Sequence, residues 1–416
     1  MRIACFLFLL FTVCSCKDKI HESQESTIGV SVDTLSTPSN AGAQPHLLSV
    51  GQDMLLSWVE YIDDSTDALM CSKYQGDQWT DPVTVASGTD WFVNWADYPR
   101  ISAFGDDQFL AAHWLAKSDT GVYDYDIQIS ISPDRGSSWT KPFVLHDDSI
   151  KAEHGFVSMA AIASDRMLAV WLDGRHTKTL EDGNPGAMTL RSAQFDKNGL
   201  ISDRVELDQK VCDCCQTSLA ISSEGPVVVY RDRSDAEVRD ISYVKRTANS
   251  WSSPQTVHQD QWKIAGCPVN GPKVISQGAR TIVTWFTHAA DIPKVYVSFS
   301  DVQNLSYNEP IQIDDGTPLG RVDLISMDEQ AKEVLVVWLE QREERASFRA
   351  RIIRENGEKM PSLHLVEVSA SRSSGFASIR QWHDDYLLAW THVDEVNLET
   401  QVMTALVGLP EKNTRL

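Results

Sequence analysis

Positive charge is scarce in this 416-residue sequence, in which 37 Lys and Arg residues stand against 58 Asp and Glu residues and leave a formal net charge of -21. A chain this acidic repels phosphate, so the charge argues against a nucleic-acid-binding surface. Glycine (22 residues) and proline (16 residues) are not enriched, which excludes collagen-like and proline-rich architectures. With 42% hydrophobic and 23% charged residues, the composition fits neither a disordered chain nor an integral membrane protein. Tryptophan, by contrast, is abundant, with 13 residues.

The N-terminal apolar run is too short to span a bilayer as a helix, and it is typical of a signal peptide. The run ends in Val13-Cys14-Ser15-Cys16, which resembles the bacterial lipobox. We therefore expect residues 1–15 to be a lipoprotein signal peptide and Cys16 to carry the lipid; an ordinary signal peptide is the alternative. Residues 16–26 are charged and polar and form an expected tether. The protein would then be exported, on the periplasmic or cell-surface side, and held at the membrane by its lipid alone.

A short apolar run that ends in an aromatic residue recurs seven times. The aromatic residues are Trp58, Trp114, Trp171, Tyr230, Trp285, Trp338 and Trp390. Their nearly constant spacing indicates an array of similar units rather than several unrelated domains. Segments of alternating apolar and polar residues lie between these markers and predict β-strands.

Each unit predicts four strands, which in the fifth unit cover 268–276, 281–286, 294–300 and 310–314. Seven such units predict an all-β, seven-bladed β-propeller of four-stranded antiparallel blades, built from residues 27–408 and followed by a C-terminal tail at 409–416. The seventh unit supplies only three strands. We therefore predict that a strand within residues 27–35 completes the last blade and closes the ring. A six-bladed ring with one divergent unit is the alternative.

One segment is more specific than the repeat. Ser132-Pro-Asp134-Arg-Gly136-Ser-Ser-Trp139 matches the Asp box, Ser-x-Asp-x-Gly-x-x-Trp, at all four defined positions. By this motif the chain resembles the sialidase-like propellers that are built from BNR repeats. The box forms a tight hairpin in which Asp binds turn amides and Gly adopts a positive φ, so it indicates a fold and not a catalytic site. The resemblance implies an activity on glycans of the exo-α-sialidase type.

Arg, His and Cys residues concentrate in the loops that share one face of the predicted ring, and turns alone do not require them. We therefore predict a polar funnel at one end of the central channel. The resemblance implies arginines that clamp a sugar carboxylate and a tyrosine nucleophile that is activated by a carboxylate. The expected substrate-binding residues are Arg175, Arg231, Arg233, Arg321, His154, His176 and His288, with Arg100 and Arg380 as further candidates. The expected catalytic residues are Tyr98, Glu153, Asp173, Tyr230 and Asp232. A structural ion network in the loop at residues 231–233 is the alternative for that segment.

Four cysteines fall in two neighbouring loops of the same face: Cys212, Cys214, Cys215 and Cys267. Two disulfides that tie adjacent blades together are the favoured interpretation. The alternatives are a thiolate site for copper(I) or zinc and a labile redox pair. Cys71 lies in an alternating strand segment and is expected to be an inert core thiol.

These features together predict an exported, monomeric lipoprotein whose funnel binds an acidic glycan and is a candidate for hydrolysing it. Three other functions stay open at this point. They are a non-catalytic binding or scaffold propeller, a metal or redox protein built on the cysteines, and a polysaccharide lyase. No nucleic-acid partner is expected.

Overall fold

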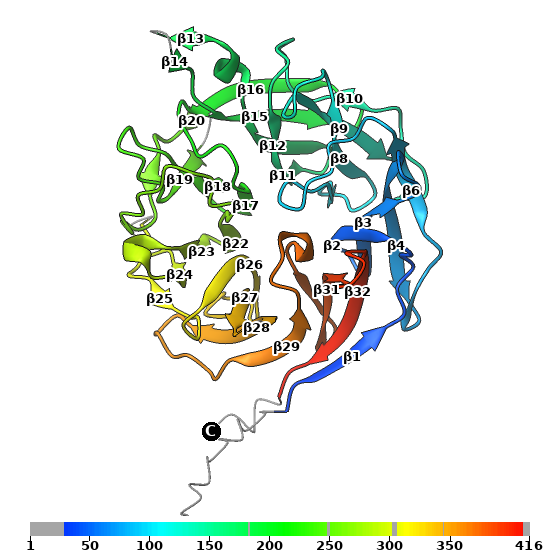
Figure 1. Ribbon diagram of the computed structural model, residues 1–416, viewed down its shortest axis with the longest axis vertical. Helices are drawn as coiled ribbons and strands as arrows, with labels where there is room; N and C mark the ends of the chain where they lie inside the picture. The colour runs from blue at the N-terminus through cyan, green and yellow to red at the C-terminus, as the bar shows by residue number, and fades with distance from the viewer. Residues whose placement is uncertain (1–28, 182–183, 248–249, 302–305, 344, 411–416) are drawn as a thin grey trace, which may run out of the picture.

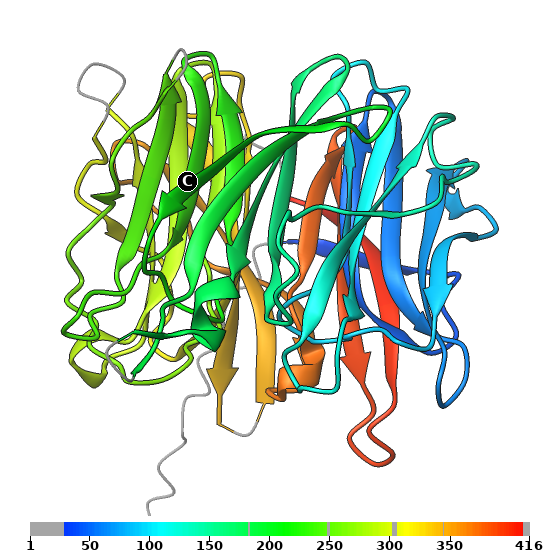
Figure 2. The same cartoon turned by 90° about the horizontal axis from the view of Figure 1, so that it is seen from above.

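The computed structural model describes residues 29–181, 184–247, 250–301, 306–343 and 345–410, so the expected signal peptide, tether and lipidated Cys16 lie outside the described residues. The described chain forms seven antiparallel blades around a central channel, and the seven-bladed prediction is confirmed (Figure 1). An edge-on view shows loops at both faces of the ring (Figure 2). Among the described residues, no helix is long and apolar enough to cross a membrane.

The first strand of each blade lies nearest the channel. Blade 1 contains β2 (Gly42–Val50), β3 (Asp53–Tyr61), β4 (Asp67–Gln75) and an outer strand in two pieces, β5 (Gln78–Trp79) and β6 (Val83–Gly88). Blade 2 contains β7 (Arg100–Ala103), β8 (Leu110–Lys117), β9 (Tyr125–Ser132) and β10 (Phe143–Val144). Blade 3 contains β11 (His154–Ala163), β12 (Arg166–Asp173), β15 (Thr189–Asp196) and β16 (Ile201–Asp208), with the small hairpin β13 (Leu180–Glu181) and β14 (Asn184–Pro185) between its second and third strands.

The second half of the ring repeats this pattern. Blade 4 contains β17 (Ser218–Ser222), β18 (Gly225–Arg231), β19 (Ile241–Thr247), β20 (Ser250–Trp251) and β21 (Gln255–Thr256). Blade 5 contains β22 (Lys273–Gln277), β23 (Arg280–Thr287), β24 (Lys294–Phe299) and β25 (Ile311–Gln312), and blade 6 contains β26 (Pro318–Ser326), β27 (Glu333–Arg342), β28 (Arg345–Arg354) and β29 (Leu363–Val368). Blade 7 contains β30 (Ser378–Trp382), β31 (Asp385–Val393), β32 (Thr400–Gly408) and β1 (Ser31–Leu35). The described loops contain three short 3₁₀ helices: η1 (Arg175–Lys178), η2 (Ala289–Asp291) and η3 (Arg372–Ser374).

The ring closes through its last blade. β1 pairs antiparallel with β32, from Ser31 opposite Gly408 to Leu35 opposite Thr404, so the first strand of the chain is the fourth strand of blade 7 (Figure 1). This closure confirms the prediction made from the missing strand of the seventh unit. It also covers the edge of β32, which would otherwise present unpaired backbone groups.

The Asp box lies between the third and fourth strands of blade 2, as the resemblance implies. Asp134 accepts hydrogen bonds from the backbone N–H and the hydroxyl of Ser138, both at 2.7 Å. Gly136 has a φ of 90°, a conformation that glycine adopts without strain. The box therefore stabilises a hairpin at the face opposite the loops that connect the blades.

The inner strand of blade 5 begins later than predicted. β22 starts at Lys273, whereas the sequence pattern placed its beginning at residue 268. Pro268 and Pro272 have no N–H to donate to a neighbouring strand, and Val269 has a φ of 53°. Residues 268–272 therefore extend the loop that precedes the strand.

Candidate functional site

The central channel holds a cavity of about 840 Å³ that is lined by the inner strands of all seven blades. Its charged lining residues are Arg100 on β7, Lys273 on β22, Asp323 on β26 and Arg380 on β30. The lining also includes exposed residues at the ends of these strands, such as Ser49 and Gln277. The cavity therefore opens toward the face that carries the turns between the first and second strands.

Positive charge exceeds negative charge in this cavity. Arg380 Nη1 donates to Asp323 Oδ2 at 3.0 Å, so one cation is paired with the one carboxylate of the lining. The Lys273 ammonium makes no hydrogen bond or ion pair within the described residues. Burial, together with the charge of Arg100, lowers the pKa of Lys273. Burial would raise the pKa of Asp323, but the charges of Arg380 and Lys273 lower it, which keeps Asp323 ionised.

Tyr98 lies next to Arg100 at the inner end of the cavity. Its hydroxyl oxygen accepts a hydrogen bond from Arg100 Nη2 at 2.7 Å, and the Arg100 guanidinium lies 4.6 Å from the centre of the Tyr98 ring. Burial would raise the pKa of Tyr98, but the charges of Arg100 and Lys273 outweigh burial and lower it. Of the expected catalytic residues, Tyr98 is the one that the structure brings next to the channel cations.

Aromatic side chains pack together in the blade-connecting loops at the other end of the channel, where the sequence predicted a polar funnel. The rings of Trp95 and Phe376 stack with centroids 6.0 Å apart, and Tyr98 packs against Phe376 at 5.6 Å. The loop of Phe376 follows β29 and reaches the centre of the ring (Figure 1). Arg321, an expected substrate-binding residue, donates to the Ser374 hydroxyl and the Gly375 carbonyl there, and its guanidinium lies 5.0 Å from the Trp95 ring. We call Trp95, Tyr98 and Phe376 the aromatic cap.

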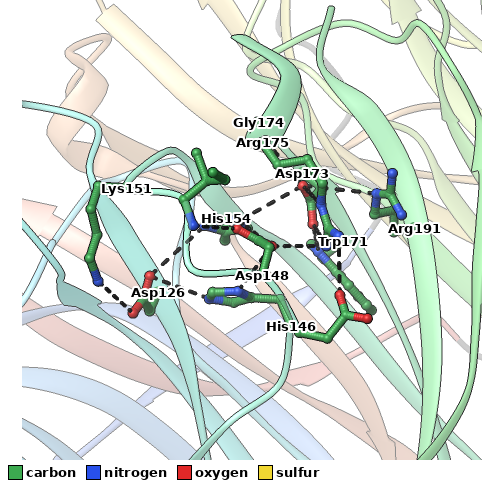
Figure 3. A network of polar contacts seen from close by, with 12 residues as sticks. Asp126, His146, Asp148, Lys151, His154, Trp171, Asp173, Gly174, Arg175 and Arg191 are labelled. Atoms are coloured by element: carbon green, nitrogen blue, oxygen red, sulfur yellow. Dashed lines mark hydrogen bonds and ion pairs between the residues drawn. The ribbon is translucent and has the colours of Figure 1, made fainter. Parts of the chain in front are cut away.

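Three expected site residues, His154, Asp173 and Arg175, meet in a buried network at blades 2 and 3 (Figure 3). The rings of His146 and His154 stack in parallel with centroids 3.8 Å apart. Asp148 Oδ2 lies 3.2 Å from His154 Nε2 and 3.3 Å from His146 Nδ1. Arg175 pairs with Asp173 at 2.8 Å and with Asp148 at 2.9 Å. Neither His146 nor Asp148 was predicted from the sequence to belong to the site.

Hydrogen bonds set the protonation states in this network. Burial would raise the pKa of Asp148, but the hydrogen bonds from His146 and His154 lower it. Burial would lower the pKa of His154, but Asp148 and Asp173 raise it. His154 and Asp173 have no exposed side-chain surface, and neither lines the channel cavity. The network therefore holds the end of β12 to the preceding loop, and a ligand in the channel does not reach it.

Asp173 also occupies a repeated structural position, two residues after a marker tryptophan. The Trp171 indole N–H donates to Asp173 at 2.8 Å, and the Trp58 indole N–H donates to Glu60 at 2.7 Å. Glu60 also accepts hydrogen bonds from the backbone N–H groups of Asn40 and Ala41. A carboxylate at this position thus fastens a loop that connects two blades.

A third group contains the expected catalytic residue Glu153. The Tyr125 hydroxyl donates to Glu153 Oε1 at 2.8 Å and lies 3.4 Å from Asp97 Oδ2. Burial raises the pKa of Glu153 to about 8 and that of Asp97 to about 7. Tyr125 is fully buried. The two carboxyl groups are therefore held partly protonated around a tyrosine that solvent does not reach.

Arg231 is fixed by the backbone of two blades. Its guanidinium donates to the carbonyls of Arg239 (2.7 Å), Asn270 (3.1 and 2.8 Å) and Phe286 (2.7 Å). It is 1% exposed and lies 4.7 Å from the Trp262 ring. These contacts agree with the structural alternative for residues 231–233.

The remaining expected residues lie outside the channel lining. The Tyr230 hydroxyl donates to Asp208 at 2.5 Å, and burial raises the pKa of Tyr230. Asp232 accepts from the Ser242 hydroxyl at 3.0 Å, and Arg233 pairs with Glu237 at 2.9 Å. His176 lies 3.8 Å from Glu206, and His288 lies beside Trp262 and Phe286. The structure does not bring these residues together into one clamp.

The cysteines do gather, but the favoured disulfides are not formed. Cys71, Cys212, Cys214, Cys215 and Cys267 are free thiols in the described part of the chain. The Sγ atoms of Cys212 and Cys215 lie 3.6 Å apart, which is well beyond the length of a disulfide bond, about 2.05 Å. Cys71 is buried on β4, and burial raises its pKa to about 11, as expected of an inert core thiol.

Comparisons with known proteins identify the fold. No protein-family model matches the sequence, and no curated protein matches it. Among solved structures, a protein of unknown function from Dyadobacter fermentans is similar over 92% of this chain and 99% of that chain, with 13% identity and a TM-score of 0.53. The polysaccharide lyase Uly1 is similar over 88% of this chain and 89% of that chain, with 9% identity and a TM-score of 0.52. The endosialidase of phage phi92 is similar over 92% of this chain and 70% of that chain, with 9% identity and a TM-score of 0.51. This chain therefore shares a propeller fold with carbohydrate-active proteins.

Proposed function

We propose that this protein binds an acidic carbohydrate in its central channel. The observation that carries the proposal is the cluster of Arg100, Lys273 and Arg380 around one carboxylate, in a protein whose formal net charge is -21. Three cations and Asp323 leave an excess of positive charge, which a carboxylate or sulfate of the ligand would balance. Guanidinium groups bind carboxylates through paired, charge-assisted hydrogen bonds.

The dimensions of the cavity agree with a ligand of this kind. Its volume of about 840 Å³ lies within the range of about 300–1,000 Å³ that is usual for small-molecule sites. A neutral sugar of the same size would leave the ammonium of Lys273 desolvated and unpaired, which is unfavourable. The channel should therefore prefer the acidic sugar to its neutral counterpart. Sialic acid is the first candidate because the Asp box resembles that of sialidase-like propellers, and because a phage endosialidase shares the fold.

Cleavage of the bound glycan is a second candidate, and Tyr98 is the residue that favours it. Tyrosine serves as the nucleophile in sialidase-type hydrolysis, and a lowered pKa makes a phenol a better nucleophile or base. Arg100 and Lys273 lower the pKa of Tyr98. We also propose that the protein is exported and anchored through a lipid on Cys16, where it would meet extracellular glycans.

The test uses matched pairs of acidic and neutral glycans, namely sialosides and their asialo forms, and uronate oligosaccharides and their carboxyl-reduced forms. We expect the full chain to bind acidic members and to ignore the neutral ones. Lys273→Met should weaken binding by about tenfold or more, since a hydrogen bond to a charged group contributes about 1.5–3 kcal/mol. Arg345→Gln is the matched control because Arg345 is an exposed cation on β28, with 79% of its side chain accessible.

Product analysis on the same mixtures separates binding from turnover. Free sialic acid would indicate hydrolysis, an unsaturated uronate would indicate elimination, and intact ligand would indicate a binding protein. Equal affinity for acidic and neutral members of every pair would refute the proposed function.

A further inference from the structure

The four cysteines of the loops that precede blades 4 and 5 form a cluster outside the channel. Cys212, Cys214 and Cys215 lie between β16 and β17, and Cys267 lies between β21 and β22. The Sγ atoms of the first three lie within 4.8 Å of one another. Cys267 lies near enough for the Cys214 thiol to lower its pKa. None of the four lines the channel cavity. We propose that this cluster is a thiolate site for one thiophilic d¹⁰ cation, Zn(II) or Cu(I).

The spacing of the sulfur atoms agrees with a shared metal ion. Four sulfurs bound to one zinc ion at about 2.3 Å, in a tetrahedron, lie roughly 3.8 Å from one another. The distance from Cys212 Sγ to Cys215 Sγ is 3.6 Å. Disulfide-bonded sulfurs lie about 2.05 Å apart, so the observed spacing fits two ligands of one ion better than a bonded pair. The backbone of Cys212 is fixed in place because its N–H donates a hydrogen bond to the Arg231 carbonyl at the end of β18.

The surroundings favour a soft ion over a hard one. Two loop carboxylates beside the cluster are already ion-paired: Asp213 with Arg233 at 3.3 Å, and Glu237 with both Arg233 and Arg239 at 2.9 Å. The other candidate metal ligands of the cluster are the cysteine sulfur atoms, which select Zn(II) and Cu(I) over Mg²⁺ or Ca²⁺.

A buried cation offsets part of the thiolate charge. Arg239 Nη1 donates to Cys212 Sγ at 3.2 Å, and Arg239 is 3% exposed. Such a hydrogen bond from outside the ligand set orients the sulfur and stabilises its anionic form when the metal is bound. The four thiols also differ in exposure, which increases from the interior toward the surface. Cys212 and Cys215 are buried, Cys214 is half-buried, and Cys267 is exposed, so Cys267 lies where an ion would arrive and complete the ligand set.

Metal titration of the full chain tests this site. The protein is purified in reductant, stripped with a chelator and titrated anaerobically with Zn(II), or with Cu(I) supplied by a competing chelator. Metal analysis and native mass spectrometry should each find about one ion per chain. The same samples, titrated with Co(II), should develop the ultraviolet charge-transfer absorption of thiolate–cobalt bonds. The two arms identify which of the two ions is preferred.

Variants connect the binding to these sulfurs. Cys212→Ser should weaken binding by at least about tenfold, and so should Cys267→Ser. Cys267 is exposed, so its replacement should leave folding intact. Cys71→Ala is the matched control because Cys71 is a buried thiol of blade 1, far along the chain from the cluster, and it should leave binding unchanged. Stoichiometric binding that is insensitive to Cys212→Ser and Cys267→Ser would overturn the proposal. A reduced chain that binds no metal would also overturn it. So would cysteines that native mass spectrometry finds oxidised and that still bind no metal after reduction.

Discussion

Replacement of Arg231 by methionine should unfold the junction of blades 4 and 5 rather than remove a substrate contact. The change keeps an unbranched apolar stem, removes the guanidinium and deletes four hydrogen bonds to three backbone carbonyls. Each buried acceptor left without a partner costs about 1–3 kcal/mol, so three of them predict a loss of at least about 3 kcal/mol in the free energy of unfolding. The stacking of the guanidinium on Trp262 is lost as well.

This loss is a large part of the free energy of unfolding of a typical folded protein, which is about 5–15 kcal/mol. Urea denaturation should show it as a lower midpoint concentration. Arg233→Met is the matched control because Arg233 is partly exposed and pairs with Asp213 and Glu237. A pair of this kind contributes about 1 kcal/mol or less. The structural role would be refuted if Arg231→Met had the same urea midpoint as the control and lost glycan binding. Arg231 would then be a substrate-binding residue, as the sequence predicted.

Two further predictions concern the Asp box and the response to pH. Asp134→Ala should lower stability by about 1 kcal/mol, because it deletes the bonds from Ser138 that hold the hairpin, and should leave glycan binding unchanged; a change in affinity would contradict this. Glu153 and Asp97 have folded pKa values of about 8 and about 7, above their unfolded values, so the native state keeps protons that the unfolded state releases. Stability should therefore fall as pH rises from about 4.5 to about 8, and Glu153→Gln should flatten that decline in thermal melts; an unaltered pH profile would be inconsistent with the raised pKa.

The sequence was most informative where one local pattern recurs. The tryptophan that marks the second strand of most blades is fully buried in four of them, at Trp58, Trp171, Trp285 and Trp338, and its period gave the number of blades. The strand pairing of β1 with β32 followed from counting strands. The Asp box was predicted in place because the hydrogen bonds that define it, to Ser132 and Asp134, are made within one hairpin.

The site was less predictable because its contacts join residues far apart in the chain. Arg231 was a reasonable clamp residue by type, but its acceptors include carbonyls 39 and 55 positions away. Lys273 was missed because it begins a strand that the pattern started at residue 268, so it did not stand out as a charged side chain in the channel. Tyr125 was missed because it is one of the alternating residues of β9, and only the fold brings it to Glu153. Charged residues within the first strand of a blade are the sequence signal that would have predicted the charged lining of the channel.

The central claim is that the channel cations bind the acidic group of a carbohydrate. Calorimetric titration of the full chain with the tightest acidic glycan of the panel tests it most directly, in parallel for the unaltered protein, Lys273→Met and Arg345→Gln. The account predicts that affinity falls about tenfold or more for Lys273→Met, stays unchanged for Arg345→Gln and weakens with added salt for the unaltered protein. Equal affinities for all three proteins would contradict it, because the acidic group would then be bound elsewhere.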